Sequence, residues 1–158
     1  AIAAVVIFIA AFQVAAVIKA YPYYGSYHNP IMGGEKKANE TLFIGSGEGL
    51  DEAGRYLSAK PGAEEMTVLS WYGNGCFSYY FSGRTINLPV ILKDAYIAAN
   101  IADADYIVVY TNQWRRNRTP RLFAILAQAE PEHSIWFNGI EYARIYKVDD
   151  LPTDIYTY

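Results

Sequence analysis

The first twenty positions of the chain are almost continuously apolar. Residues 1–20 read AIAAVVIFIAAFQVAAVIKA, and only Gln13 and Lys19 interrupt the run. About 20 apolar residues, at roughly 1.5 Å each, span the ~30 Å hydrocarbon layer of a bilayer. A buried helix of a soluble domain and the core of a signal peptide share part of this pattern. A helix without a polar face favours lipid contact, so we predict a transmembrane helix over residues 1–20.

The end of this helix carries residues typical of a membrane interface. The long stem of Lys19 lets its ammonium group reach the lipid headgroups. Tyrosines follow at once, as in an aromatic belt. The predicted interface residues are Lys19, Tyr21, Tyr23, Tyr24 and Tyr27. Only one flank of the helix is visible, so the distribution of Lys and Arg does not fix its orientation.

Residues 21–40 form a connector that proline and glycine interrupt. Pro22, Gly25, Pro30, Gly33 and Gly34 fall within it. Because these residues break regular structure, the connector is not one long helix. We expect it to lie along the membrane surface.

Apolar strands and amphipathic helices alternate over residues 41–149, and residues 150–158 form a tail. The expected strands are Thr41–Ile44, Met66–Trp71 and Tyr106–Tyr110, then a hairpin of Ser134–Phe137 and Ile140–Tyr146 around Asn138-Gly139. The expected helices are Leu50–Ala59, Val90–Asn100 and one that begins at Pro120 after Thr119, while Phe77–Phe81 is a short strand or a loop. The continuous apolar run at Tyr106–Tyr110 is typical of a strand in the centre of a sheet. The chain therefore predicts an α/β fold: one transmembrane helix, then a small three-layer α/β sandwich with a C-terminal β-hairpin.

Composition and charge narrow the chemistry. The net charge of the 158 residues is -3 and the pI is near 5.3, whereas nucleic-acid binders are usually basic. Cys76 is the only cysteine, and His28 and His133 are the only histidines. We therefore predict no internal disulfide, no metal site, no cofactor and no nucleic-acid partner. Because the first residue is Ala1, we expect a processed chain or a part of a longer one.

A glycine-rich turn follows the first expected strand and precedes a helix. Gly45-Ser46-Gly47-Glu48-Gly49 is in the context of a phosphate-binding loop. The spacing is GxGxG, however, and Glu48 places a negative charge where a phosphate would bind. A tight turn that needs small residues is the favoured interpretation.

A basic segment with one tryptophan follows the central strand. Ligands of open α/β sheets gather beyond the carboxyl ends of the strands. An indole ring stacks on sugars, and guanidinium groups bind phosphate in forked hydrogen bonds. The candidate residues for binding a ligand or a lipid headgroup are Trp114, Arg115, Arg116, Arg118 and Arg121. The alternative is a solvated basic loop near anionic lipid.

Two acidic pairs have the residue types of acid–base catalysis. They are Asp103 with Asp105, before the central strand, and Asp51 with Glu52, at a helix start. Turn and helix-start roles explain both pairs without chemistry. We predict no catalytic residue in this chain. The segment Ser70–Phe77, rich in aromatics and glycine, suits a carbohydrate or another subunit equally well.

Several segments together form a family pattern. The segments are Tyr23-Tyr24 through Tyr27-His28-Asn29-Pro30-Ile31-Met32-Gly33-Gly34, then Gly45–Ala53, Asp105–Tyr110 with Asn112-Gln113, Pro131-Glu132-His133 and Asn138–Ala143. In this order, after a last apolar helix, they resemble the C-terminal part of bacterial GT-C glycosyltransferases of the dolichyl-phosphate-mannose–protein mannosyltransferase type. The resemblance covers nearly the whole chain.

The resemblance implies a polytopic enzyme that takes sugar from a polyprenyl-phosphate donor. Its acidic catalytic residues would lie in early extracytoplasmic loops, before Ala1, and no residue here matches them. The terminal domain would lie outside the cytoplasm and shape access of the acceptor. The chain alone is then a non-catalytic, single-pass module, with the bilayer, the preceding transmembrane region and polyprenyl phosphate as expected partners.

Two other classes of protein stay open. The first is an accessory structural subunit of a large membrane complex, with the helix packed against other subunits. The second, less favoured, is a pilin-like filament subunit, because an apolar N-terminal helix before an α/β head suits that architecture. The early glutamate of bacterial type IV pilins is missing from Ala1–Phe12.

Overall fold

The computed structural model describes residues 2–88, 94–116 and 119–156. The chain forms two compact units. The first consists of Ala1–Ile44 with Asn138–Ile140, and the second of Gly45–Phe137 with Glu141–Tyr158. Each unit is described by itself below.

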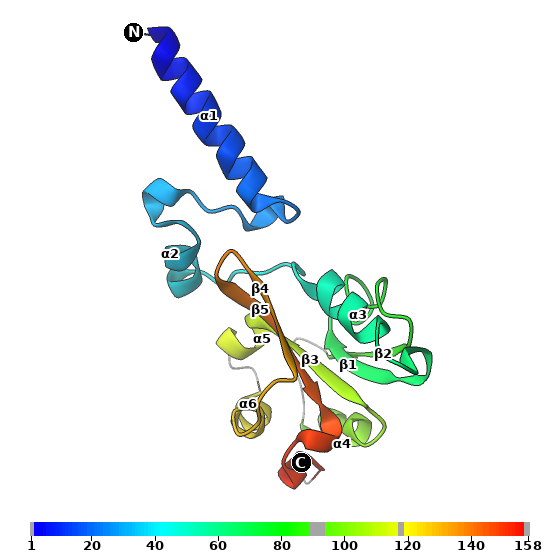
Figure 1. The fold of residues 1–158 in the computed structure, drawn as a ribbon. Helices are drawn as coiled ribbons and strands as arrows, with labels where there is room; N and C mark the ends of the chain where they lie inside the picture. Colours follow the sequence, from blue (N-terminus) through cyan, green and yellow to red (C-terminus); the bar gives the residue numbers. More distant parts are fainter. Residues whose placement is uncertain (1, 89–93, 117–118, 157–158) are drawn as a thin grey trace. The chain divides into compact units, whose positions relative to one another are not determined.

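The first unit is built on one long apolar helix (Figure 1). Its elements are α1 (Ile2–Ala20), the short 3-10 turns η1 (Tyr24–Ser26) and η2 (Pro30–Met32), and α2 (Gly34–Thr41). The predicted helix is confirmed over Ile2–Ala20, and Ala1 lies outside the described residues. With 19 residues, α1 is long and apolar enough to cross a membrane, and none of its apolar window is buried. Large side chains such as Ile7 and Phe8 are 68% and 71% exposed.

The connector after α1 is not one long helix, as predicted, but the strand expected at Thr41–Ile44 is wrong. Helix α2 continues to Thr41, whose hydroxyl donates a hydrogen bond to the carbonyl oxygen of Lys37 at 2.7 Å. Leu42 and Phe43 are 54% and 63% exposed. A strand is stabilised by its neighbours in a sheet, and residues 41–44 are not part of the sheet that the described residues form.

The second unit contains a five-stranded mixed sheet in the order β2-β1-β3-β5-β4. The strands are β1 (Thr67–Trp71), β2 (Arg84–Leu88), β3 (Tyr106–Tyr110), β4 (His133–Phe137) and β5 (Ile140–Lys147). The helices are α3 (Leu50–Ser58), α4 (Asp94–Ile101), α5 (Thr111–Arg116) and α6 (Pro120–Leu126), with the 3-10 turns η3 (Ala63–Glu65), η4 (Val148–Asp150) and η5 (Thr153–Tyr156). The α/β fold is confirmed.

Strand β3 is the central strand, as the apolar run predicted. It pairs in parallel with β1 and antiparallel with β5. All five of its residues are buried, so both faces of the sheet are covered. The side chains of Tyr106 and Tyr110 point to the face covered by α3, since alternate residues share a face. Ile107 and Val109 occupy the other face and are also buried.

The C-terminal hairpin is confirmed. Strands β4 and β5 are neighbours in the sheet. Asn138 and Gly139 both have positive φ values, of 49° and 76°. Two consecutive positive φ values define the turn that Asn-Gly favours in two-residue hairpins.

One strand of the second unit differs from the sequence-based expectation. The edge strand β2 was not expected, because its burial is partial and its polar residues mask the apolar pattern. Of the two alternatives for Phe77–Phe81, a strand or a loop, the structure has the loop, as a series of turns. The helix expected at Val90–Asn100 is α4, whereas residues 90–93 lie outside the described residues. Helix α6 begins at Pro120 as predicted, although the side chain of Thr119 makes no capping hydrogen bond.

Candidate functional site

The carboxyl ends of β1 and β3 form a topological switch point. These two strands are parallel neighbours. The chain leaves β1 toward β2 at one edge of the sheet, and leaves β3 toward β4 at the opposite edge. Ligands of open α/β sheets bind in the crevice that such divergent connections leave. Trp71 ends β1, and α5 with its basic residues follows Tyr110 of β3 directly.

The glycine-rich turn at residues 45–49 binds its own carboxylate. The amide of Ser46 donates a hydrogen bond to Oε2 of Glu48 at 2.5 Å, and the hydroxyl of Tyr110 donates to the same oxygen at 3.0 Å. The amide of Gly47 donates to the Tyr110 hydroxyl at 3.0 Å. Burial, followed by the charge of Glu48, raises the pKa of Tyr110, so its proton stays in place. The carboxylate takes the place of a phosphate, which supports the interpretation as a turn.

The glycines of this turn are required by close packing. Gly45 and Gly47 have φ values of 101° and 116°. A Cβ atom on Gly45 would lie 2.8 Å from the hydroxyl of Tyr110, and one on Gly47 would lie 2.8 Å from Sγ of Cys76. Residues other than glycine rarely adopt such φ values. The glycines therefore have a structural explanation that needs no ligand.

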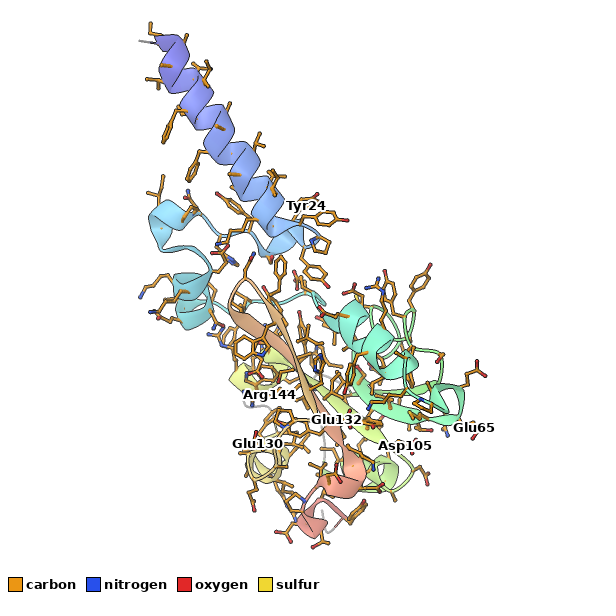
Figure 2. The ribbon with its side chains drawn as sticks, in the orientation of Figure 1. Tyr24, Glu65, Asp105, Glu130, Glu132 and Arg144 are labelled. Carbon is orange, nitrogen blue, oxygen red and sulfur yellow. The ribbon has the colours of Figure 1, made fainter. Side chains whose placement is uncertain are left out.

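The predicted ligand residues are placed on α5 and α6. Trp114 packs under the guanidinium of Arg144, whose Cζ lies 4.8 Å from the centre of the indole ring. Arg144 in turn donates a hydrogen bond to Glu141 at 2.6 Å, and this pairing raises its pKa. Arg144, which is labelled in Figure 2, thus covers one face of the Trp114 ring, although the sequence did not indicate this residue.

The arginines of this set are distributed over two helices. Arg115 and Arg116 occupy the last turn of α5, where the helix dipole favours cations. Arg121 is exposed in the first turn of α6. All three interact with other groups of the chain, and Arg118 lies outside the described residues. Binding of a phosphate by this set stays a prediction.

Two buried polar atoms at the same end of the sheet have no hydrogen-bond partner within the part of the chain that the structure describes. They are Nε1 of Trp71 and Oδ1 of Asn112. The amide nitrogen of Asn112 donates to the carbonyl oxygen of Gly45 at 3.0 Å, so only its oxygen is unsatisfied. Buried polar groups are nearly always paired with protein or water. One donor and one acceptor are thus available at the switch point.

A cluster of ionisable side chains at the other end of β3 was missed by sequence reasoning. Nζ of Lys60 and the hydroxyl of Tyr56 both lie close to Oε1 of Glu132, at 2.5 Å and 2.6 Å. The hydroxyl of Tyr106 donates to Oε2 at 3.1 Å (Figure 2). The ring of His133 stacks on Tyr56, with centroids 4.2 Å apart. These residues come from three separate parts of the sequence. The family pattern contained Tyr106, Glu132 and His133 in two of its segments, but it did not indicate that they meet Tyr56 and Lys60.

The electrostatics of this cluster favour a structural role. Burial alone would raise the pKa of Glu132, but the hydrogen bonds from Lys60, Tyr56 and Tyr106 lower it below its usual range. The bond to Glu132 raises the pKa of Lys60. A general base works best with a pKa near the operating pH. Glu132 is therefore a poor base and a good counter-ion that joins α3, β3 and the start of β4.

An open polar depression lies beside Lys60. It has a volume of 430 Å³, and Glu64, Glu65 and Ser82 contribute to its lining. Lys60 is already neutralised by Glu132, so two carboxylates dominate the charge of the depression. It does not suit an anionic ligand such as a phosphate.

The acidic pairs have structural contacts. Oδ2 of Asp105 accepts a hydrogen bond from the amide of Thr67 at 2.7 Å, which joins the starts of β1 and β3. Asp51 pairs with Arg55 one helical turn later, at 2.7 Å. Over residues 2–88, 94–116 and 119–156, no group of three or more His, Cys, Asp or Glu side chains is arranged to hold a metal ion.

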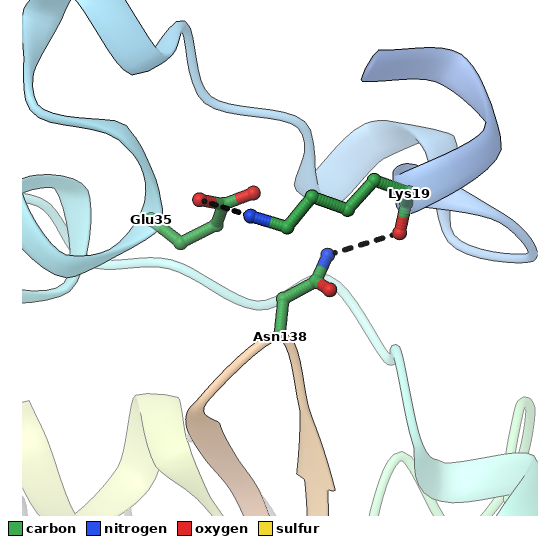
Figure 3. A network of polar contacts seen from close by, with 3 residues as sticks. All are labelled: Lys19, Glu35 and Asn138. Carbon is green, nitrogen blue, oxygen red and sulfur yellow. Dashed lines mark hydrogen bonds and ion pairs between the residues drawn. The ribbon is translucent and has the colours of Figure 1, made fainter. Parts of the chain in front are cut away.

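In the first unit, the predicted interface residues gather at one end of α1. Lys19 pairs with Glu35 at 3.4 Å, and the carbonyl oxygen of Lys19 accepts a hydrogen bond from Nδ2 of Asn138 at 3.2 Å (Figure 3). The rings of Tyr21 and Tyr24 meet edge to face, with centroids 6.1 Å apart. Tyr21, Tyr24 and Tyr27 are exposed and Tyr23 is half-buried. Their contact with lipid headgroups stays a prediction.

Comparison with protein-family models, with curated proteins and with solved structures finds no match for this chain. The resemblance to GT-C glycosyltransferases therefore depends on the sequence motifs alone.

The residues bound to Glu132, namely Tyr56, Lys60 and Tyr106, form with it the Glu132 cluster. A substitution at Glu132, measured at several pH values, tests the role of this cluster. The side chains of Lys60 and Glu132 are 24% and 28% exposed. Glu132→Gln removes the counter-ion of Lys60, and we expect the free energy of unfolding at pH 7 to fall by about 1–3 kcal/mol. Because the pKa of Glu132 is lower in the folded state, its stabilisation is present above the unfolded value near 4.5 and is lost as pH falls through the folded value. The difference between the two proteins should shrink below that pH.

Urea unfolding of the full chain in detergent, followed by tryptophan fluorescence between pH 3 and pH 8, measures this difference. Glu130→Gln, two positions earlier on an exposed residue, is the matched control and should unfold like the wild type. A Glu132→Gln protein as stable as the control at pH 7 would contradict the role assigned to the cluster.

Proposed function

We propose that this protein is a membrane-anchored, non-catalytic module that α1 holds on the outer side of a bacterial membrane. It is related to the C-terminal domain of polyprenyl-phosphate-sugar-dependent glycosyltransferases. In this proposal, the catalytic residues belong to other transmembrane segments, and the α/β unit shapes the access of the acceptor. The observation that carries the proposal is the exposure of the apolar side chains of α1.

Helix α1 offers apolar side chains around its whole circumference. Its 19 residues give a length of about 28 Å at ~1.5 Å each, close to the thickness of the hydrocarbon layer. Ile2, Ile7, Phe8 and Ile18 are each more than 65% exposed. Apolar surface in water is unfavourable by roughly 25 cal/mol per Å². Lipid tails remove this penalty along the entire helix.

The polar groups of the second unit support a non-catalytic role. Glu48 and Glu132, two carboxylates with several hydrogen-bond donors, hold structural elements together. Asp51 and Asp105, which the sequence raised as acid–base candidates, bind Arg55 and a backbone amide. Each of these acids therefore has a role in the fold.

The single cysteine provides a direct test of anchoring and orientation. Cys76 is exposed in the second unit. In intact spheroplasts, we expect a membrane-impermeant maleimide to label Cys76 fully, because the unit lies outside the cytoplasm. The labelled chain should stay with the membrane pellet after extraction at alkaline pH.

The controls separate the two parts of this claim. Cys76→Ser should remove the label without changing the pellet fraction. Charged substitutions in the middle of α1, such as Ile7→Lys with Ala10→Lys, disfavour insertion by about 2.5–3.5 kcal/mol each and should release the chain. Labelling only after permeabilisation contradicts the outer location, and a wild-type chain in the soluble fraction contradicts the anchor.

The basic residues of α5 give a test of the lipid ligand. We expect Trp114→Ala, Arg115→Ala and Arg116→Ala together to weaken binding of a short-chain prenyl phosphate by about tenfold or more, since each arginine near a phosphate contributes ~1 kcal/mol. Titration calorimetry in detergent measures this, with the matching prenol as the ligand control. Arg84→Ala removes an exposed cation at the start of β2 and should leave binding unchanged. Equal affinity for the triple variant and the wild type would favour the solvated basic loop.

An accessory subunit of a membrane complex is the second candidate function. Trp136 lies on the edge strand β4 and is 60% exposed. Exposed edge strands and large aromatic residues are features of contacts with other proteins. In this alternative, the chain co-migrates with partner subunits in detergent extracts of native membranes, and Trp136→Lys releases it as a smaller species. Tyr79→Lys, at a position 83% exposed, is the control. A monomeric chain in both extracts contradicts the subunit alternative.

A further inference from the structure

The connector does not run flat from the end of α1. Parts of the connector up to Ile31 instead share two grooves with α1. A groove of 130 Å³ is lined by Val17 and Ala20 of α1 and by Tyr24 of the connector. A second groove, of 290 Å³, is lined by Phe8 and Phe12 of α1 and by Ile31. The connector therefore lies beside successively earlier residues of α1 as it proceeds.

The position of Ile31 along α1 sets its depth. Phe12 and Phe8 lie eight and twelve residues before Ala20, which corresponds to about 12 Å and 18 Å along the helix axis. Half of the hydrocarbon layer of a bilayer measures roughly 15 Å. If Ala20 marks the interface, Ile31 reaches the level of the hydrocarbon core. This step depends on the proposed transmembrane role of α1.

The tip of the connector is apolar and exposed. Ile31 and Met32 are 82% and 77% exposed. A monomeric protein in water rarely presents two such side chains together at the tip of a turn without a binding partner. Ile31 forms one apolar surface with Phe8 and Phe12, because all three line the same groove.

The backbone of the tip satisfies its own donors. The amide of Ile31 donates to Oδ1 of Asn29 at 3.0 Å, and the amides of Met32 and Gly34 donate to the carbonyl oxygen of Asn29, both at 3.0 Å. The amide of Gly33 donates to the carbonyl oxygen of Pro30 at 3.1 Å. Pro30 itself has no amide hydrogen. Non-helical backbone is costly in lipid because its polar groups lack water, and this turn removes that cost for every donor from residue 30 to residue 34.

Charged residues follow the apolar tip of the connector, and the first of them lies beside Lys19 at the end of α1. Glu35 pairs with Lys19 at 3.4 Å (Figure 3). Lys36 and Lys37 follow on α2 and are exposed. Their charges suit the anionic headgroups at a membrane surface. The boundary between apolar and charged residues in the connector thus coincides with the end of α1.

We propose that Pro30–Met32 is a re-entrant wedge that inserts into the hydrocarbon layer beside α1, with Ile31 and Met32 in contact with lipid acyl chains. This differs from a connector that lies only on the membrane surface. The wedge adds a second apolar anchor to the single helix and fixes the rotation of α1 relative to α2.

Site-directed spin labelling of the full chain in liposomes tests this wedge. In a Cys76→Ser background, nitroxide labels are attached at Ile31→Cys, Met32→Cys, Phe12→Cys and Lys36→Cys in separate proteins. Frequent collisions of the nitroxide with oxygen indicate that the label lies in lipid. Frequent collisions with a water-soluble nickel complex indicate that it lies in water. We expect the ratio of oxygen to nickel accessibility at positions 31 and 32 to match that at position 12. It should exceed the ratio at position 36 by about tenfold, as expected for a label below the headgroups.

The reference positions keep the two proposals distinct. High nickel accessibility at positions 31 and 32, with position 12 in lipid, overturns the wedge and leaves the anchor intact. High nickel accessibility at position 12 as well overturns the transmembrane role of α1. Low accessibility of positions 31 and 32 to both reagents, at a low ratio of protein to lipid, means that protein covers the tip, and this also overturns the wedge.

Discussion

The apolar circumference of α1 is the constraint on which the proposed membrane anchor depends. This helix is long and apolar enough to span a membrane and buries none of its apolar window against the rest of the chain, which favours an apolar surrounding. Once lipid supplies that surrounding, the level of the headgroups follows from Lys19, its partner Glu35 and the tyrosines at Tyr21 and Tyr24. The connector must then satisfy its own backbone wherever it follows the helix, and the turn around Asn29 does so.

In the second unit, polar contacts set the position of α3 over the central strand. Both ends of β3 use a tyrosine hydroxyl that binds a glutamate. Tyr110 binds Glu48 just before α3, and Tyr106 binds Glu132, which also holds Lys60 just after α3. Hydrogen bonds to charged groups contribute more than neutral ones. The two tyrosine–glutamate pairs hold α3 near both of its ends. The position of its apolar side chains over the sheet is thereby fixed.

The parts of the fold that the sequence predicted are those with local signals. A continuous apolar run identified α1 and the central strand, and Asn138-Gly139 identified the hairpin. The failures depend on contacts between distant residues. The apolar segment Thr41–Ile44 resembles a strand but has no neighbouring strand, whereas β2 looks polar but pairs with β1 along its whole length. The Glu132 cluster joins positions 56, 60, 106 and 132. Contacts between such distant positions leave no local pattern in the sequence.

The location of the candidate site stays a prediction, although the sheet has the topology from which it was inferred. The rule about carboxyl ends of strands indicated the end of β3, and the switch point with β1 is there. Trp114, however, packs against Arg144, so its indole is partly used by the fold. The unsatisfied atoms of Trp71 and Asn112 are a stronger sign of binding, because both are buried and lack a hydrogen-bond partner among the described residues. A donor and an acceptor at one end of the sheet suit a hydroxyl group or a water better than a phosphate. A phosphate needs several donors at once, so this end of the sheet fits a neutral polar group better than an anion.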